Sequence, residues 1–557
     1  MGVVAGDGIG AGAAVTLWPR VGFPSEPLDA EERRRLAPYV TDLDGPVFAL
    51  VNLPEATKGA AFARYSRSPK GLRRLLLDEF LTDGPAPDAV APGAGQARAG
   101  ALYERVLAEY GDDSVAQLGG AHIAVEGVSN VLTKIIEWGR LAAYLEQSTR
   151  YVDLSARVGG AFRYARPPGV MADPSLAPAY ELALDGAFAA YGRMVAALTT
   201  HLEGAVPVDP EVPAPARARA LRARALDGAR GLLPAATVAN VGVFATGQAY
   251  EAMLVRLLAH PLDEARACGE LMLGELRKVI PEFLTRVDRP DRGGAHGAYM
   301  RRGRDAARRL AEGLALDERP AGPDGPAVRL LDFDPDGESR VLAHALWAEC
   351  GRSLADVRAR VDGLSAHERA EALAAITGAR SDRRQRPGRA FEATTYVFEV
   401  VADYGAYRDL QRHRMLSLQA QSLTPVLGYD MPELVAEAGH ADAFAAAQRA
   451  SAALHDEIAA GVPDEAPYAV SLAHRVRFTM IMSAREAMHV IELRSQPQGH
   501  DAYRAVAQEM HRCIREVAGH PAIAAAMTFV DHSRPAAGRM DAERRTAAHG
   551  GGRPPRW

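Results

Sequence analysis

The spacing of apolar residues in the first half of the chain predicts one strand followed by a series of helices. The apolar run at 47–51 (VFALV) is typical of a strand, and it precedes segments with helical spacing. The predicted helices span residues 72–81, 101–109, 115–144, 179–202, 245–258 and 263–280. A Pro/Gly/Ala-rich stretch at 84–99 interrupts them, and Ser114 is placed to cap the helix at 115–144.

The same plan restarts after a Gly/Arg-rich stretch at 288–304 and a Pro/Gly linker at 319–326. Residues 328–333 (VRLLDF) predict a strand that leads into a helix at 340–350. Two further helices are predicted, at 392–415 and 476–493. The second is amphipathic, with apolar residues at helical spacing: Ile481, Ala484, Met488 and Ile491.

The repeated order of elements indicates an internal duplication of the sequence. Trp138-Gly139-Arg140 and Gln147-Ser148 each have a counterpart 274 residues later, in Arg412-His413-Arg414 and Gln421-Ser422. The pattern predicts an α+β fold of two tandem domains with strands and long helices. The predicted units are a partly disordered leader at 1–35, a first domain at 36–300, a linker at 301–325, a second domain at 326–535 and a disordered tail at 536–557.

Length and composition narrow the class of protein. A chain of 557 residues is too long for one core. A net charge of −5 gives no reason to expect nucleic-acid binding, and the arginine run between 380 and 389 is more often a solvated loop. The sequence has no apolar run long enough to span a membrane, and its first twenty residues do not resemble a signal peptide. We therefore expect neither a nucleic-acid partner nor a membrane.

The three cysteines, Cys268, Cys350 and Cys513, are widely separated and form no CxxC pair. They support neither a disulfide framework nor a zinc site, so we expect a reducing, cytoplasmic setting and no bound metal. All three lie in helix-like contexts without the basic turn that activates a thiolate. A mechanism with a cysteine nucleophile is therefore disfavoured.

The second half concentrates basic residues that suit an anionic ligand. The guanidinium groups of Arg412 and Arg414, beside His413, can bind phosphate or carboxylate bidentately. The simpler alternative is a solvated basic helix end that complements the helix dipole. Arg485 and His489 are four residues apart and share a helix face, whereas Arg494 lies about 180° round from Arg485 by ideal helix geometry.

The first half offers a complementary set of polar residues. Glu146, Ser148 and Arg150 occur together in the segment EQSTRY, after a predicted helix. Arg230 lies in ARGLLP, where glycine and proline predict a turn. Glu146 and Arg150 can also simply form an ion pair with one another.

The motif RHR-x-x-S-x-x-x-x-S at 412–422 resembles the RHRxxSxxxxSxR motif of flavin-dependent thymidylate synthases. The first half resembles the same motif with its start eroded and its end intact, so the chain resembles a tandem-duplicated, partly degenerate member of that family. The family forms homotetramers in which flavin and deoxyuridylate lie between subunits. One subunit supplies the RHR segment and a later arginine-bearing helix, and a partner supplies the E-x-S-x-R segment and an arginine before Leu-Pro.

The resemblance implies a role for each matching residue. Arg494 is implied as the catalytic group that stabilises the ionised uracil ring. The implied substrate-binding residues are Glu146, Ser148, Arg150, Arg230, Arg412 and Arg494. The implied cofactor-binding residues are Ser114, Glu146, Arg412, His413, Arg414, Arg485 and His489.

Each half has lost the family residues that the other half retains. The first half has Trp138, Gly139, Gln248 and Leu257 where the family has its RHR and later arginine positions. The second half has Ala420, Thr424 and Pro467 in place of the family's glutamate and two arginines. Ser483 and Gln419 also replace asparagines of the family. The resemblance thus implies two domains, each a small sheet with long helices, that pack as a pseudo-dimer. We therefore expect one composite site per chain, and two chains paired as a homodimer that imitates the tetramer.

The resemblance implies reductive methylation of deoxyuridylate at carbon 5. FAD would be the cofactor, with methylenetetrahydrofolate and NADPH as co-substrates. Two alternatives stay open: a non-catalytic flavin- or nucleotide-binding paralogue, and C5-methylation of another pyrimidine nucleotide.

Overall fold

The computed structural model describes residues 27–81, 115–314, 316 and 327–533, apart from 46–47, 66–67, 69, 151 and 210–211, together with a two-stranded ribbon near the N-terminus. The ribbon and the first helices are β1 (Leu17–Trp18), β2 (Val21–Gly22), α1 (Ala30–Leu36), α2 (Glu55–Tyr65), α3 (Leu72–Leu75) and η1 (Leu76–Phe80). The predicted helix at 72–81 is thus present as α3 and η1. The predicted strand at 47–51 reduces, in its described part, to one bridge between Leu50 and Val40. The predicted helix at 101–109 and the predicted tail at 536–557 lie outside the described residues.

The first half is built on a three-stranded antiparallel sheet with the order β3-β5-β4. Its strands are β3 (Gly120–Ser129), β4 (Ala142–Glu146) and β5 (Val238–Thr246), with η2 (Val115–Gln117) before β3 and α5 (Asn130–Ile136) between β3 and β4. The predicted helix at 115–144 is therefore wrong. Residues 120–129 pair with β5 along their length, and Gly127, with φ of 70°, lies where the register shifts. Its left-handed backbone is incompatible with a continuous helix.

The second half is built on a four-stranded sheet with the order β6-β7-β9-β8. Its strands are β6 (Ala327–Phe333), β7 (Thr395–Asp403), β8 (Ser417–Ala420) and β9 (Arg475–Ser483). The predicted strand at 328–333 is confirmed. The predicted helix at 392–415 is wrong, because it divides into η6 (Arg389–Glu392), β7 and α15 (Tyr404–Leu410), and the one at 476–493 divides into β9 and α18 (Ala484–Arg494). β-Branched and aromatic residues in TYVFEVVAD favour the strand.

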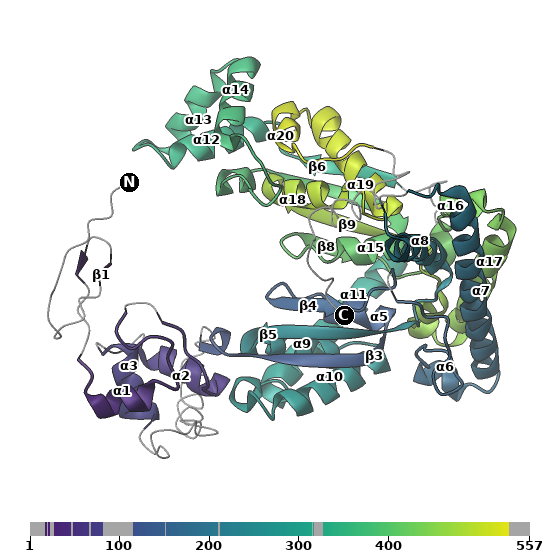
Figure 1. The fold of residues 1–557 in the computed structure, drawn as a ribbon, viewed down its shortest axis with the longest axis horizontal. Coiled ribbons are helices and arrows are strands. Elements are labelled where there is room, and N and C mark those ends of the chain that lie inside the picture. Colours follow the sequence, from purple (N-terminus) through teal and green to yellow (C-terminus); the bar gives the residue numbers. More distant parts are fainter. Residues whose placement is uncertain are drawn as a thin grey trace.

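Helices cover one face of each sheet (Figure 1). The first sheet packs on α9 (Gly247–Leu258) and α10 (Asp263–Leu276), and the second on α18 and α19 (Asp501–Arg512). Long helices α7 (Leu176–Ala205) and α17 (Ala441–Gly461) pack together at one end of the molecule, so the prediction of an α+β fold with long helices is confirmed. The predicted helices at 179–202, 245–258, 263–280 and 340–350 are confirmed with shifted ends.

The remaining elements connect these layers. They are α6 (Pro168–Ala172), α8 (Ala214–Ala229), η3 (Arg230–Leu232), η4 (Pro281–Leu284), η5 (Pro290–Gly294), α11 (Ala295–Gly313), α12 (Gly337–Trp347), α13 (Leu354–Asp362), α14 (Ala366–Thr377), η7 (Pro425–Leu427), α16 (Glu433–Glu437), η8 (Pro463–Ala469), η9 (Cys513–Val517) and α20 (Pro521–Ala526). Within the described part of the chain, none of the helices combines the length and the apolar character needed to cross a membrane.

The two halves meet through equivalent segments. Residues 231–236 run antiparallel to 468–473, with Ala235 N donating to Val470 O at 2.8 Å and Leu472 N donating to Leu233 O at 2.9 Å. At the centre, Pro234 bridges Ser471, the residue at the equivalent position of the other half. The edge strands β4 and β8 also face one another across the centre, where Arg140 donates to Ser417 at 2.8 Å (Figure 1). The halves are therefore related by an approximate two-fold axis at these contacts.

The contact between the halves leaves no room for a side chain at Gly231. A Cβ there would lie 3.0 Å from Ala473 Cβ and 3.1 Å from Phe444 Cζ. We expect Gly231→Val to lower the free energy of unfolding by about 1–3 kcal/mol through overpacking, measured by urea denaturation. Gly186→Ala, at a helical position with nothing within 4 Å, should not destabilise. Equal stability of the two variants would show that this contact is loosely packed.

Candidate active site

A buried carboxylate joins the two halves at the end of β4. Glu146 Oε1 accepts from Arg408 Nη2 at 2.8 Å, and Oε2 accepts from Lys134 Nζ at 3.0 Å and from Arg412 Nη2 at 3.2 Å. Its side chain is 0% exposed. Burial opposes its charge, but the coulombic pull of Arg408, Lys134 and Arg412 outweighs burial and holds the pKa of Glu146 well below its usual value.

Two of these cations are equivalent to one another. Lys134 and Arg408 stand 274 residues apart, at matching positions of α5 and α15, and both reach Glu146. Lys134 is also paired with Glu137 at 2.6 Å. Neither Lys134 nor Arg408 was predicted as a site residue, and Glu146 pairs with them rather than with Arg150. The alternative of a Glu146–Arg150 ion pair is therefore wrong.

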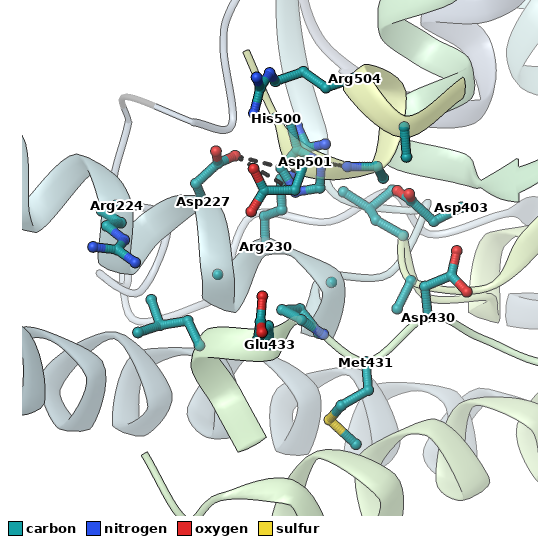
Figure 2. A pocket seen from close by; sticks show the side chains of 18 of the residues that line it. Arg224, Asp227, Arg230, Asp403, Asp430, Met431, Glu433, His500, Asp501 and Arg504 are labelled. Carbon is teal, nitrogen blue, oxygen red and sulfur yellow. Dashed lines mark hydrogen bonds and ion pairs between the residues drawn. The ribbon is translucent and has the colours of Figure 1, made fainter. Parts of the chain in front are cut away.

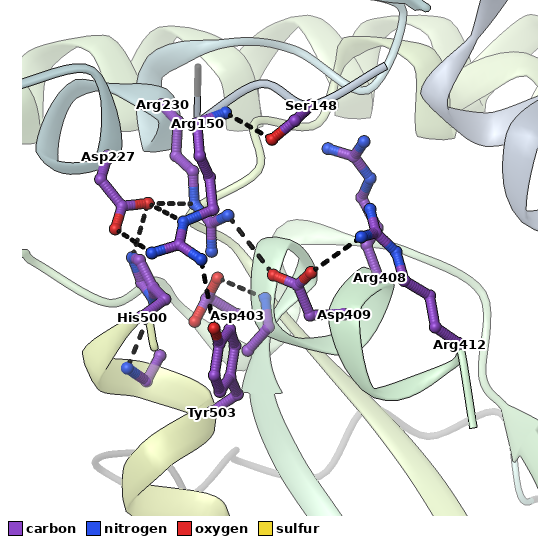
Figure 3. Close-up of polar contacts among 12 residues, drawn as sticks. Ser148, Arg150, Asp227, Arg230, Asp403, Arg408, Asp409, Arg412, His500 and Tyr503 are labelled. Atoms are coloured by element: carbon purple, nitrogen blue, oxygen red, sulfur yellow. Dashed lines mark hydrogen bonds and ion pairs between the residues drawn. The ribbon is translucent and has the colours of Figure 1, made fainter. Parts of the chain in front are cut away.

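Beside this cluster lies a second group of charges, the anion corner, which consists of Arg150, Arg230, Asp227 and Asp409 (Figure 3). Arg150 forms a bidentate pair with Asp227, with distances of 2.9 and 3.0 Å. Arg230 lies 3.7 Å from Asp227 and 3.6 Å from Asp409, which is contributed by the other half. The corner thus joins the end of α8, the turn η3, the segment after β4 and helix α15.

The carboxylates of the anion corner are ionised. Burial raises the pKa of each group, but the basic groups around them have the larger effect and lower the pKa of both Asp227 and Asp409. His500, Arg230 and Arg150 act on Asp227, and Arg230, Arg412 and Arg494 act on Asp409. Arg230 Nη2 is buried and has no hydrogen-bond partner among the described residues.

Arg494, at the end of α18, is oriented by the RHR histidine. Its Nε donates to His413 Nε2 at 2.8 Å, and its guanidinium lies 5.4 Å from the ring of Tyr503. Arg150 donates to the hydroxyl of the same tyrosine at 3.1 Å. Tyr503 therefore links the anion corner to Arg494, although no motif in the sequence marks it.

His413, Glu486 and His489 form a buried group whose ligand atoms all lie within 4.8 Å of one another, close enough to hold a metal ion. The hydrogen bonds argue against that use. Because His413 Nε2 accepts from Arg494, the ring proton is on Nδ1, the atom that faces Glu486 at 3.7 Å. A metal on Nδ1 would require the opposite tautomer. Burial, Arg386 and other nearby arginines lower the pKa of His489 to about 4, a positive environment that disfavours a further cation.

His413 and Arg414, two of the three RHR residues, border a pocket between the halves. A cavity of about 250 Å³ is lined by His413, Arg414, Ser417, Trp138 and Arg140, among others. Arg414 also stacks over Tyr144 at 5.1 Å, and the side chain of Arg412 is 41% exposed. These basic donors and the indole suit a flat, anionic cofactor.

The other predicted residues are more dispersed. Arg485 donates to Pro387 O at 2.9 Å and approaches Glu392, so it points to the loop before β7. Ser148 Oγ accepts from Arg150 N at 3.2 Å. Ser114 lies outside the described residues. The structure thus brings Glu146, Arg150, Arg230, Arg412, His413 and Arg494 together, while Arg485 lies apart.

A larger cavity of about 740 Å³ lies behind the anion corner, between α8, α16 and α19 (Figure 2). Asp227, Arg230 and His500 form a wall that this cavity shares with the corner. Burial and the charge of Arg230 lower the pKa of His500 to about 3, so its imidazole is neutral. The sequence did not predict Asp227, Asp409 or His500. The only signal was an acidic residue three positions before an arginine, in D-x-x-R at 227–230 and at 409–412.

One of the reciprocal positions serves packing. Leu257, equivalent to Arg494, is fully buried in the first core, and Pro467 is equivalent to Arg230. Near Pro467, the carboxylate of Glu264 accepts from Ser129 N and Oγ and from the Tyr468 hydroxyl. These three donors are therefore bound by a carboxylate of the protein itself. The basic run is also partly structural, because Arg380 is paired with Glu492 at 2.6 Å and its side chain is 3% exposed.

Comparisons with known proteins match both halves. The family model described as thymidylate synthase complementing protein matches residues 57–282 and 329–520. A UPF0159 protein of Chlamydia muridarum is 37% identical over 525 residues, covering 93% of this chain and 98% of that protein. A flavin-dependent thymidylate synthase of Nitratidesulfovibrio vulgaris is 28% identical over 193 residues, covering 33% of this chain and 66% of that protein.

A solved structure, the UMP/dUMP methylase PolB from Streptomyces cacaoi bound with 5-Br dUMP, aligns with 38% of this chain and 96% of its own. The TM-score is 0.29 and the identity 17%, so this match carries no argument about function.

The Glu146 cluster predicts a large, pH-dependent loss of stability. Glu146→Gln leaves the buried Arg408 without its carboxylate partner, while Lys134 keeps Glu137 and the partly exposed Arg412 keeps Asp409. We expect a loss of about 3–5 kcal/mol in the free energy of unfolding at pH 7, measured by urea denaturation. Because the folded pKa of Glu146 is lowered, its contribution is present above the unfolded value of about 4.3 and is lost as pH falls below it. The difference in the free energy of unfolding between wild type and variant should therefore decrease below about pH 4.

The matched control is Glu181→Gln, which removes a surface partner of Arg166 whose side chain is 50% exposed. Its loss should stay below about 1 kcal/mol at every pH. Similar losses for the two variants would contradict the importance of the buried cluster.

Proposed function

This chain belongs to the thymidylate synthase complementing protein family, and we propose that it catalyses the reductive methylation of deoxyuridylate at carbon 5. The observation that carries the proposal is the convergence of two incomplete residue sets. Arg412 and Arg494 of the second half lie in one network with Glu146, Arg150 and Arg230 of the first. We infer that the halves act as a pseudo-dimer with one composite site.

The proposed roles follow from charge and position. Arg494 supplies a positive charge to the uracil ring as it ionises, which raises the nucleophilicity of carbon 5. His413 holds that guanidinium by accepting from Nε at 2.8 Å, and Tyr503 limits its movement from the other side. Arg230, with an unpartnered Nη2, receives the anionic end of the nucleotide.

Glu146 has a different role from the one that the resemblance implies. With 0% of its side chain exposed and three cations around it, it orients Arg412 rather than touching either ligand directly. Arg408 and Lys134 hold the Glu146 carboxylate in place by hydrogen bonds, so this carboxylate can in turn hold Arg412 in a fixed orientation. Arg412 keeps part of its guanidinium exposed for a ligand.

The residues around the 250 Å³ cavity fit a flavin. Arg414 suits its phosphates, and Trp138 and Arg140 border the same space. When bound, reduced FAD supplies a hydride, with methylenetetrahydrofolate as the carbon donor and NADPH as the source of electrons. His413 and Arg414 border this cavity between the halves. Ser483 caps helix α18 by accepting a hydrogen bond from Glu486 N at 3.3 Å.

The main competing function is that of a non-catalytic flavin- or nucleotide-binding paralogue. It is favoured by the replacement of two family asparagines, at Ser483 and Gln419. C5-methylation of another pyrimidine nucleotide is the second alternative. Among the described residues, none is assigned to bind a ribose hydroxyl, the group that distinguishes a ribonucleotide from a deoxyribonucleotide. The two are separated from the main proposal by turnover and by substrate choice.

Tritium release from 5-tritiated deoxyuridylate, with folate, FAD and NADPH present, tests turnover. We expect release by the wild type and a loss of at least about 100-fold in Arg494→Ala, because one preorganised charge at the reacting ring is removed. Arg230→Ala should lose activity mainly through a raised KM, because its contact is with the non-reacting end.

Arg222→Ala is the matched control, since this surface arginine is 53% exposed and pairs with Asp153 away from the site. Binding of FAD without any tritium release would favour the binding paralogue. Release from 5-tritiated uridylate in preference to deoxyuridylate would favour the second alternative.

We also propose that two chains pair, as the family's tetramer implies. An apolar, uncovered face of the first sheet supports this, with Leu145 80% and Phe244 43% exposed. The register places Ala143 opposite Phe244 and Leu145 opposite Gly242, so both side chains are on one face. Ile481, equivalent to Phe244 in the second sheet, is 44% exposed. Apolar residues gathered on a sheet face favour association.

Light scattering after gel filtration should give twice the 59.5 kDa mass of one chain. Leu145→Glu, which buries a charge in the proposed contact, should give the mass of one chain. Leu182→Glu, on α7 and 77% exposed, should leave the mass unchanged. A wild-type mass of one chain would rule out the paired state.

A further inference from the structure

The arginines of the anion corner already have negatively charged partners, which are carboxylates of the protein. All three nitrogens of the Arg150 guanidinium donate to the protein. Nε and Nη2 bind Asp227 at 2.9 and 3.0 Å, Nη1 binds the Tyr503 hydroxyl at 3.1 Å, and Nη2 also reaches Gln498 O at 3.3 Å. Arg150 is therefore held in place by partners from both halves, with little capacity left for a phosphate (Figure 3).

Arg230 differs from Arg150 in this respect. Its side chain is 5% exposed and lies 3.6–3.7 Å from Asp409 and Asp227, too far for direct hydrogen bonds. Its Nη2 has no partner among the residues that the structure describes. Among the described residues, Arg230 is thus the arginine of the corner that has a donor without a hydrogen-bond partner.

The charges of the corner cancel before a ligand enters. Two guanidinium groups, Arg150 and Arg230, face two ionised carboxylates, Asp227 and Asp409. Arg412 approaches Asp409 at 3.6 Å and is shared with Glu146. His500, 3.9 Å from Asp227, is neutral and adds no charge. A phosphate therefore enters a corner whose positive charge is largely compensated, which weakens its electrostatic gain.

Two further groups face the corner: Arg494, which acts on Asp409, and the buried carboxyl of Asp403, on which Arg230 acts. We propose that Asp227 and Asp409 are specificity-determining residues that act as built-in counter-anions and reduce the contribution of the substrate's phosphate to binding. The pyrimidine end then supplies most of the affinity, and the phosphate binds through Arg230. The ligand class is a pyrimidine nucleoside 5′-monophosphate for which the uncharged nucleoside is a close competitor. The proposal rests on the proposed function, because it takes this site to be the nucleotide site.

A purely structural role predicts the opposite effect. If the two carboxylates served only to aim the arginines at a phosphate, their loss would disorder Arg150 and Arg230 and weaken phosphate binding. If they are counter-anions, their neutralisation releases donors and strengthens it. The sign of the change therefore separates the two roles.

The test is the ratio of the Kd of deoxyuridine to the Kd of dUMP, measured by calorimetry on the full chain at one ionic strength. This ratio isolates the phosphate, because changes at the pyrimidine end affect both ligands. We expect the ratio to rise about tenfold in Asp227→Asn and in Asp409→Asn, the equivalent of about one charge-assisted hydrogen bond. Asp153→Asn, which neutralises a surface carboxylate paired with Arg222, should leave the ratio unchanged.

A ratio that stays constant or falls in both folded variants overturns the proposal. Asparagine keeps the shape of aspartate, and circular dichroism checks each fold; if one variant does not fold, the other decides. If dUMP binds to none of the proteins, inorganic phosphate replaces it as the probe. Tighter phosphate binding by the variants then supports the counter-anion role, and no gain overturns it.

The same measurements distinguish this proposal from the proposed function. A raised ratio without tritium release would mean that the methylation proposal fails while the counter-anions stand. Tritium release by the wild type with an unchanged ratio would mean the reverse.

Discussion

A single buried carboxylate imposes the strongest constraint on this molecule. Glu146 ends an edge strand of the first half, and with none of its side chain exposed it must keep cations from both halves within hydrogen-bond distance. An unpaired charge in that position costs several kcal/mol. Docking of α15 onto β4 is therefore obligatory, and this docking brings the RHR segment to the anion corner.

The duplication allows equivalent positions of the two halves to diverge. In a symmetric assembly, a mutation in one subunit alters every copy of a position. Within one chain each half can change separately, so Leu257 completes a core whereas its equivalent Arg494 is bound by His413, and Glu264 binds Ser129 and Tyr468 near Pro467. The bridge between the equivalent residues Pro234 and Ser471 joins the two halves.

The periodicity of the sequence identified the helices that are amphipathic along their whole length, such as α7, α9 and α10. It failed at the junctions of β7 with α15 and of β9 with α18, where a strand runs directly into a helix. In TYVFEVVADYGAY and in VRFTMIMSAREAM, strand and helix are both rich in apolar residues, and each junction is marked only by a capping Asp403 or Ser483. Because apolar residues stand at successive positions of both strands, the alternation that marks a strand is weak, and a continuous helix was predicted in each case.

The chemistry of the two half-sets was readable from residue types and from the comparison of the two copies, since each copy retains polar residues that the other has lost. The partners of those residues were not readable. Arg150 meets Asp227 and Tyr503, which are 77 and 353 residues away, and Glu146 meets Arg408 at a separation of 262. Pairings of this kind depend on how two sheets dock, because sequence spacing encodes only neighbours along one element. Only the folded chain could therefore show that the arginines expected to bind phosphate already have carboxylate partners.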